Sequence, residues 1–451
     1  MTNPLTDFSD LPLFDRIRPE HVEPAITQLL AEARAAQETV ADPAFPADWK
    51  AIAKVLDVAT ERLGVAWGAV GHLKSVADTP ELRNAYNAVM PQVSEFWTQM
   101  GADERLYAKY KAMDPAALTP EQRQAHKNAI RGFVLSGAEL QGEARTRYAQ
   151  IQDRMAELAQ KFSENALDST DAYAHYAGES EVEGIPGDAL EAAAEGAKAD
   201  GREGYKFTLK LPSYLPVMQY ARSSALRETL YRAYATRASE LAEGDAVKFD
   251  NTAIVREILA LRHEEAQLLG YPDFATVSVV PKMAESPEQV ITFLRDLATR
   301  ARPYALQDLA DLREFAAQEL GLPDPQPWDW PYVGEKLKEA RYSFSDQEVK
   351  LYFPAPKVLA GLFKIVETLF GVAIRRDQAP VWHPSVEFYR IERAGERVGQ
   401  FYLDPGARKG KRGGAWMDDV RTRWLRPDNG HLQTPVALSL IHISEPTRLG
   451  M

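Results

Sequence analysis

The spacing of hydrophobic residues predicts a mostly helical chain. From Pro19 onward, apolar side chains recur every three to four residues, which is the spacing that lines one face of an α-helix. Pro19 falls in the first turn, where a missing backbone N–H costs nothing. The same spacing predicts further helices at about 48–76, 80–112, 120–135, 140–170, 225–239, 250–269, 287–320, 333–341 and 356–370.

Two regions change to the alternation that is typical of β-strands. Residues 205–211 alternate as a half-buried strand that Pro212 would end. Residues 386–391 and 398–403 form a second pair of alternating runs, and the turn Ala394-Gly395 between them predicts a hairpin. The predicted fold class is therefore mainly α, with a small β-sheet element near residues 205–211 and 386–403.

A change of composition predicts the domain boundary. Between Gly178 and Gly204 the chain is rich in Gly, Ala and Glu, and it has no large apolar residue after Leu190. We expect an N-terminal helical domain over 1–177, a linker over 178–204 and a second domain over 205–437. The linker is expected to hold a short helix over 188–199, with Asp188 as its cap.

Residues 438–451 carry a separate expectation. The run Leu438-Ser-Leu-Ile-His-Ile-Ser-Glu-Pro-Thr-Arg448 resembles a translated sequencing adapter, so this segment is expected to be a non-native tail. The alternative is an ordinary strand, because Val436, Leu438 and Leu440 alternate and Pro446 would end the run. Against that alternative, such a strand would have little chain behind it to pair with.

Composition and charge limit the classes of partner. Hydrophobic residues make up 45% of the 451 residues and charged residues 26%, as in soluble globular proteins. A net charge of -12 repels nucleic acid and anionic membranes, so neither is expected as a partner. There is no cysteine and no apolar run long enough for a secretion signal or a membrane span. These features favour a cytoplasmic location.

The histidines do not form a recognisable metal motif. In His-Glu-x-x-His, two imidazoles four residues apart on one helix hold zinc, and the Glu activates the bound water. No two of the eight histidines here are four residues apart. The nearest match is His263-Glu264-Glu265-Ala266-Gln267, which we interpret as a solvated helix face. His72 is interpreted as a packed or surface residue. No metal ligand is assigned.

The segment Arg408-Lys-Gly-Lys-Arg-Gly-Gly-Ala-Trp416 offers another candidate site. Four cations with flexible glycines could cradle a phosphate, but the strand and helix of a P-loop are missing around them. The favoured interpretation is that Gly413 and Gly414 allow another chain to approach their backbone closely. The paired carboxylates Asp418 and Asp419 are adjacent in sequence and point in different directions, and no Gly-x-Ser-x-Gly elbow exists. The residues alone show no complete active site.

Several segments, taken together and in order, resemble the thimet-oligopeptidase family of zinc metallopeptidases. They are Leu13-Phe-Asp-Arg-Ile-Arg-Pro-Glu-His-Val-Glu-Pro-Ala25, Leu211-Pro-Ser-Tyr-Leu-Pro-Val-Met218, Arg227-Glu-Thr-Leu-Tyr-Arg-Ala-Tyr-Ala-Thr-Arg-Ala238, Phe249-Asp-Asn251, Ile258-Leu-Ala-Leu-Arg-His-Glu-Glu-Ala-Gln-Leu-Leu-Gly270, Phe401-Tyr-Leu-Asp404 and Lys411-Arg-Gly-Gly-Ala-Trp-Met-Asp-Asp419.

The resemblance implies a multi-helix, two-lobed peptidase, monomeric at full length, that cuts short peptides in a deep channel by means of zinc. It implies that Arg412, Gly413, Gly414 and Ala415 lie beside the substrate. It also implies that the zinc ligands follow Ala437, so that no catalytic or metal-binding residue is expected within this chain. The chain is then expected to be an inactive N-terminal fragment of a zinc oligopeptidase, whose catalytic domain begins at 205 and is cut before the zinc helix. Its exposed apolar helix faces are expected to favour aggregation. The alternative function is a non-catalytic helical module that binds peptides.

Overall fold

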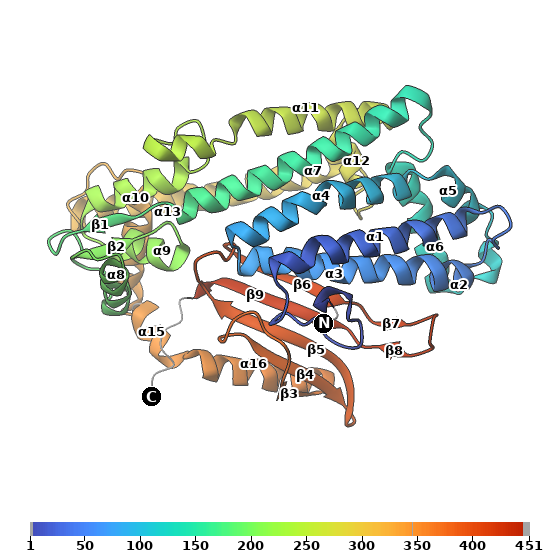
Figure 1. Cartoon of the computed structure of the whole chain (residues 1–451). Coiled ribbons are helices and arrows are strands. Elements are labelled where there is room, and N and C mark those ends of the chain that lie inside the picture. The colour runs from blue at the N-terminus through green and yellow to red at the C-terminus, as the bar shows by residue number, and fades with distance from the viewer. Residues whose placement is uncertain (1–2, 345, 445–451) are drawn as a thin grey trace.

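The structure is a computed structural model that describes residues 3–344 and 346–444. Three long helices, α1 (Pro19–Ala41), α3 (Val58–Val76) and α4 (Pro80–Gly101), pack together and cover one face of a five-stranded sheet (Figure 1). The largest apolar core joins these helices to the inner face of the sheet. The prediction of a mainly helical fold with a small sheet is confirmed.

Capping side chains explain where the first helices begin and end. Thr79 accepts a hydrogen bond from the backbone N–H of Leu82 at the start of α4. A single helix over 80–112 was predicted, but α4 ends at Gly101 and α5 (Glu104–Lys111) begins after Asp103. The Asp103 carboxylate accepts from the backbone N–H groups of Arg105 and Leu106, so it starts a new helix there. The prediction of one continuous helix over 80–112 was wrong because Asp103 acts as an N-cap.

The helices of the N-terminal half continue with shorter elements. They are η1 (Pro4–Thr6), α2 (Trp49–Ile52), the π-helix η2 (Ala53–Asp57), η3 (Pro115–Ala117), α6 (Pro120–Leu135) and α7 (Gly142–Asp171). Helix α7 packs against both α4 and α11 (Thr252–Leu268) and so joins the N-terminal helices to the helices that follow (Figure 1).

A second apolar core lies around the middle of the chain. It is built from the short hairpin β1 (His175–Ala177) and β2 (Tyr205–Phe207), with α8 (Gly187–Ala199), α9 (Leu211–Tyr220) and α10 (Ser224–Thr236) around them. The helices that complete this half are η4 (Gly244–Phe249), α12 (Phe274–Val279), α13 (Pro287–Glu319), α14 (Trp330–Tyr342), α15 (Asp346–Tyr352) and α16 (Ala355–Phe370).

Two local predictions in this region were wrong. The strand predicted over 205–211 stops at Phe207, because Leu211 begins α9 and Pro212 occupies the first turn of that helix. The predicted cap Asp188 lies inside α8, whose N-cap is Pro186. The Asp188 carboxylate instead forms an ion pair with Lys350.

The five-stranded sheet has the order β3-β4-β5-β9-β6. Its strands are β3 (Ala373–Asp377), β4 (Glu387–Arg393), β5 (Glu396–Gly406), β6 (Ala415–Arg421) and β9 (Val436–Ser444), and a separate pair is β7 (Trp424–Leu425) with β8 (Leu432–Gln433). The predicted hairpin is confirmed as β4 and β5. Ala394 and Gly395 take φ values of 51° and 84°, as a type I′ turn requires.

Strand β9 contains the first part of the segment expected to be a tail. It runs parallel to β5 and antiparallel to β6, and Leu438 and Leu440 are only 3% and 1% exposed. The argument that a strand here would lack a partner is therefore wrong. That 438–451 is non-native stays a prediction, and residues 445–451 lie outside the described part of the chain.

The apolar cores do not follow the boundary predicted at 178–204. The largest core contains residues from α1, α3 and α4 together with Phe388, Tyr402 and Leu438 of the sheet. The N-terminal helices and the sheet are thus one packed unit, although they lie far apart in sequence. The division into 1–177, 178–204 and 205–437 remains a prediction from composition.

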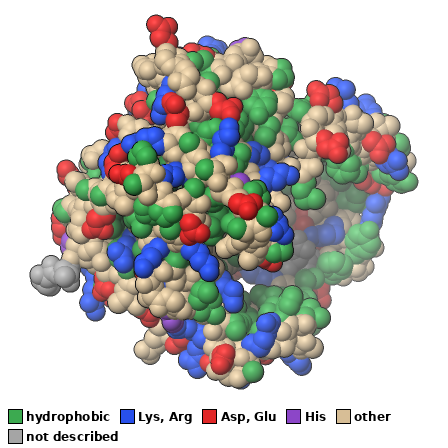
Figure 2. Space-filling model, turned by 90° about the vertical axis from the view of Figure 1, so that its right-hand side faces the viewer, with side chains coloured by type: hydrophobic (Ala, Val, Ile, Leu, Met, Phe, Trp, Pro, Cys, Tyr) green, Lys and Arg blue, Asp and Glu red, His purple; other side chains and the backbone are tan. Residues whose placement is uncertain are grey.

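Large apolar side chains are exposed on α13 and α16, as predicted. Helix α16 packs Leu359, Phe363 and Val366 against the outer face of the sheet, but Leu362 and Ile365 are 50% and 59% exposed. Figure 2 shows hydrophobic side chains gathered along a hollow on one face of the molecule. Among the described residues, no helix is long and apolar enough to cross a membrane.

Candidate functional site

The residues predicted to lie beside a substrate form the entry into strand β6. Arg412, Gly413 and Ala415 are exposed, and Gly414 is half-buried. The Arg412 guanidinium lies over the ring of Trp416, 4.9 Å from its centre, which is a cation–π contact. The structure thus brings the four predicted residues together at the surface, at one end of an edge strand.

Strand β6 leaves one side open. It pairs with β9, and within residues 3–344 and 346–444 no strand pairs with its other edge. Because neighbouring residues of a strand direct their backbone groups to opposite sides, every second N–H and C=O of β6 faces this edge. Met417, in the middle of the strand, is 78% exposed. An extended peptide could add to the sheet here by backbone hydrogen bonds.

Close backbone approach inside the protein occurs at Gly410. This residue has φ +74°, and a Cβ added there would lie 2.8 Å from the carbonyl oxygen of Asp78. The backbone N–H of Asp78 also donates to the carbonyl of Gly410 at 3.1 Å. A Cβ at Gly413 or Gly414 would meet no atom within 4 Å. The backbone of these two glycines is open, and an approach to it by a substrate stays a prediction.

Two of the four cations in this segment are turned inward. Arg408 donates to both carboxylate oxygens of Asp404 at 2.8 Å, and the Lys411 ammonium lies 2.9 Å from the same carboxylate. The side chains of Asp404 and Lys411 are fully buried. These two cations serve an internal ion pair, which argues against a phosphate cradle. Lys409 and Arg412 are the exposed cations of the segment.

Burial and pairing act in opposite directions on Asp404. Burial alone would raise the pKa of its carboxyl, but the hydrogen bonds from Arg408 and Lys411 outweigh it and lower that pKa below its usual value. Burial lowers the pKa of the Lys411 ammonium, opposed by its bond to Asp404. The Trp382 indole N–H also donates to Asp404, at 3.0 Å. Sequence reasoning missed this residue, because Asp404 lies in strand β5 and its pairing with Arg408 and Lys411 depends on the path of the loop that follows.

The histidine segment on α11 is divided between solvent and the packing against α7. His263 is exposed, Glu264 forms an ion pair with Arg147 at 2.6 Å, and Glu265 is buried with a bond from Gln152. Burial raises the pKa of Glu265. The solvated-face interpretation is therefore right for His263 and wrong for Glu265, which faces α7. Across the described residues, no group of three or more His, Cys, Asp or Glu side chains could hold a metal ion.

His72 is a packed residue rather than a ligand. It is 6% exposed, and its ring lies 4.1 Å from the ring of Trp382 and 5.3 Å from that of Phe14, in both cases edge to face. Burial lowers its pKa to about 3, so the ring is neutral near neutral pH. Of the two expected alternatives, a packed or a surface residue, the structure shows the packed one.

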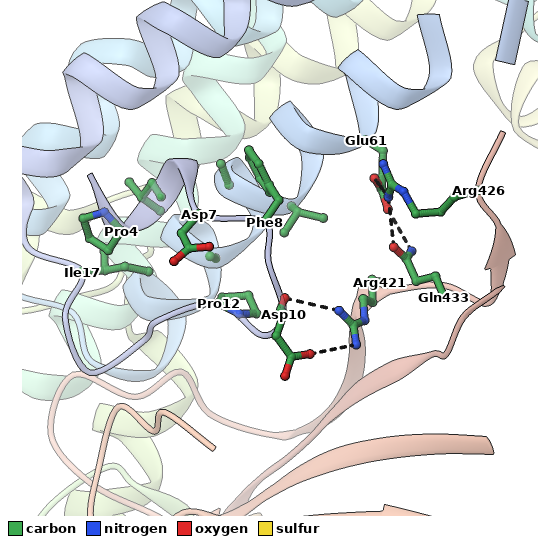
Figure 3. Close-up of a pocket in the computed structure, with 14 residues that line it drawn as sticks. Pro4, Asp7, Phe8, Asp10, Pro12, Ile17, Glu61, Arg421, Arg426 and Gln433 are labelled. Carbon is green, nitrogen blue, oxygen red and sulfur yellow. Dashed lines mark hydrogen bonds and ion pairs between the residues drawn. The ribbon is translucent and has the colours of Figure 1, made fainter. Parts of the chain in front are cut away.

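A pocket of about 40 Å³ lies between the N-terminal segment, α3 and the region of β6 to β8 (Figure 3). Four of its charged side chains are paired with one another: Arg421 with Asp10 at 3.5 Å, and Glu61 with Arg426 at 2.6 Å. Gln433 also donates to Glu61, at 2.8 Å. A cavity of this volume has room for little more than a water molecule, so it is not a peptide site.

Sequence comparisons give the relationship to known proteins. Residues 217–450 match Peptidase family M3, and residues 26–145 match the N-terminal domain of neurolysin and thimet oligopeptidase. Oligopeptidase A of Salmonella typhimurium is 45% identical over 453 residues, which cover 99% of this chain and 66% of that protein. Oligopeptidase A of Escherichia coli is 44% identical with the same coverage.

A plant relative is similar over the same span. The organellar oligopeptidase A of Arabidopsis thaliana is 37% identical over 465 residues, which cover 99% of this chain and 58% of that protein. The chain therefore spans about two thirds or less of the length of these relatives. The profile of Peptidase family M3 by itself covers more than half of the chain. On this similarity, the chain belongs to peptidase family M3.

Proposed function

We propose that this chain supplies the substrate-binding part of an oligopeptidase and that an extended short peptide pairs with the open edge of β6. The observation that carries the proposal is the edge of β6 that no strand of the described residues pairs with; it begins at Ala415, directly after Arg412, Gly413 and Gly414. Edge strands bind extended peptides through main-chain hydrogen bonds, which every peptide can form. Membership of a peptidase family makes a peptide the natural occupant.

Zinc is the metal that the family implies, and the described residues do not fit it. No two of the eight histidines are four residues apart, and the described part holds no suitable cluster of ligands. We therefore assign no step of hydrolysis to residues of this chain. The proposed zinc ligands belong to the third of the relatives' length that lies outside the matched region. The 451-residue chain is proposed to bind peptides without cleaving them.

The edge-pairing proposal is tested with backbone-methylated peptides. A fluorescein-labelled nonapeptide of alanine, leucine and phenylalanine is compared with two versions, N-methylated at the odd or at the even positions. A peptide that pairs with one edge uses the N–H groups of alternate residues only. We expect one methylated version to lose binding and the other to keep it, in fluorescence anisotropy with the purified chain. Equal affinities for all three peptides would contradict pairing with an edge.

The absence of hydrolysis is tested separately. The purified chain is incubated with a quenched fluorogenic nonapeptide, with and without added zinc. No cleavage above buffer is expected in either case. Cleavage that a chelator abolishes would show that this chain carries a working metal site and would overturn the proposal.

The second candidate is a natural peptide-binding module with no catalytic role. The same open edge of β6 supports it, since binding needs no metal. The two candidates differ in the gene: reads across codon 438 that continue into a His-Glu-x-x-His motif support the peptidase, whereas a stop close behind this codon supports the module. For either candidate we propose a cytoplasmic protein, in keeping with the lack of cysteine, and for the full-length peptidase a monomer.

A further inference from the structure

The loop before β6 is fastened to three separate parts of the fold. Its N-terminal end follows β5, and its C-terminal end is the candidate segment Arg412–Ala415. Between them, the Arg408 side chain donates to the carbonyl of Val76 at 2.8 Å, and the Arg412 backbone N–H donates to the carbonyl of Ser75 at 2.8 Å. Both carbonyls belong to the last turn of α3. The loop is thus tied to the N-terminal helices.

The same loop is tied to the second half of the molecule. The backbone N–H of Gly410 donates to the Asp171 carboxylate at 3.3 Å, at the C-terminal end of α7. Lys210, just before α9, donates to the carbonyl of Arg408 at 3.0 Å and pairs with Asp171 at 2.8 Å. The loop therefore lies where the sheet, the N-terminal helices and the unit built around β1 and β2 meet.

One buried carboxylate organises these contacts. Asp404 receives both Arg408 and Lys411, and Lys411 also donates to the carbonyls of Asp404 and Gly406 at 2.8 Å. Loss of the negative charge would remove the carboxylate that lies 2.9 Å from the fully buried Lys411 ammonium, and a change to a buried ion pair is far costlier than loss of an exposed one. The loop would then lose the carboxylate that both Arg408 and Lys411 contact.

We infer that Asp404 is a positioning residue for peptide binding: through Arg408 and Lys411 it fixes the loop that sets the place of Arg412–Ala415 and of the open edge of β6. This inference rests on the proposed function. The backbone N–H of Arg412 is bonded to the carbonyl of Ser75, and β6 begins only three residues later. A shift of the loop at Arg412 would therefore move the start of β6 as well. Asp404 touches no substrate in this scheme and acts through the loop.

The experiment compares Asp404→Asn with a matched control, Glu61→Gln. Glu61 is also a carboxylate that pairs with an arginine, Arg426, between α3 and the C-terminal strands, but it lies outside the loop. Arg408→Gln is a milder second variant, because it leaves the pair between Asp404 and Lys411 in place. Each purified chain is assayed for affinity toward the neutral fluorescein nonapeptide, for melting temperature, and for hydrogen exchange of residues 408–416.

We expect Asp404→Asn to weaken peptide binding at least fivefold and to speed hydrogen exchange in 408–416. Arg408→Gln should act in the same direction to a smaller extent, and it decides the matter if Asp404→Asn does not fold. Glu61→Gln should keep the wild-type affinity even if its melting temperature falls as far as that of Asp404→Asn.

The inference is overturned if wild-type affinity and exchange survive in Asp404→Asn or, should that variant not fold, in Arg408→Gln. It is also overturned if Glu61→Gln weakens binding equally. Failure of the wild-type chain to bind the peptide would refute the proposed function, whatever the exchange shows.

Discussion

Replacing Leu438 by alanine tests whether β9 is packed into the apolar core. Leu438 is 3% exposed and lies on the inner face of the sheet, in the core that also contains residues of α1, α3 and α4. Truncation of a fully buried leucine costs about 2–5 kcal/mol, because burial is lost and a cavity is left. The strand lies between β5 and β6, which leaves it little freedom to relax toward the cavity.

The matched control is Leu432→Ala on β8, where the leucine is 41% exposed. We expect this control to change the free energy of unfolding by less than about 1 kcal/mol, as is usual for exposed positions. Both variants are measured by urea unfolding, followed by tryptophan fluorescence and by circular dichroism. A cost below about 1 kcal/mol for Leu438→Ala as well would refute the reasoning, because a side chain that hangs outside the core can be shortened without a cavity.

Three further predictions concern stability and solubility. Gly410→Ala should cost about 1–3 kcal/mol, because φ is positive and Asp78 blocks the new methyl group, whereas Gly413→Ala should be nearly neutral; thermal unfolding of both variants checks this. His72 has a folded pKa of about 3, below its unfolded value, so its contribution to stability is full above about pH 6.5 and is lost as the pH falls toward 3. His72→Leu should therefore flatten the acid limb of the stability profile, and an unchanged limb would count against a buried neutral ring. On α16, the exposed residues Leu362, Ile365 and Leu369 can be replaced by glutamine. We expect the variant to bind less of a hydrophobic dye and to aggregate less in light scattering, with an unchanged melting temperature.

Most helices could be predicted from the sequence because their signals are local. The predicted range 120–135 matches α6 at both ends, and Thr119 and Gln122 form the capping box that starts it. The hairpin of β4 and β5 was predictable for the same reason, since its turn and both strands are adjacent in the chain. Errors arose where a cap or a helix-starting proline was misinterpreted, as at Asp103 and Pro212.

The sheet as a whole could not be predicted because its pairing is not local. Strand β6 carries Asp418 and Asp419 in its middle, so alternation does not mark it as a strand. Strand β9 has the alternating pattern, but its partners lie at residues 400–406 and 415–421, and nothing in the local sequence names them. The sequence therefore predicts a tail from Leu438 onward, whereas the structure places Leu438 and Leu440 in the sheet.

The candidate site was predicted in part. The sequence pointed to Arg412–Ala415 through the family resemblance, and the structure places these residues at the surface beside a free edge. Nothing in the sequence distinguishes the cations that turn inward, Arg408 and Lys411, from those that face solvent. That Arg408 and Lys411 turn toward Asp404 follows from the packing of the loop against α3, which only the folded chain shows.

The central claim is that a peptide binds along the open edge of β6. Hydrogen exchange of the purified chain, with and without a saturating neutral nonapeptide, tests it most directly. The account predicts slower exchange in residues 412–421, because peptide binding covers backbone groups that face solvent in the free chain. Protection confined to other segments, with no change in 412–421, would contradict it.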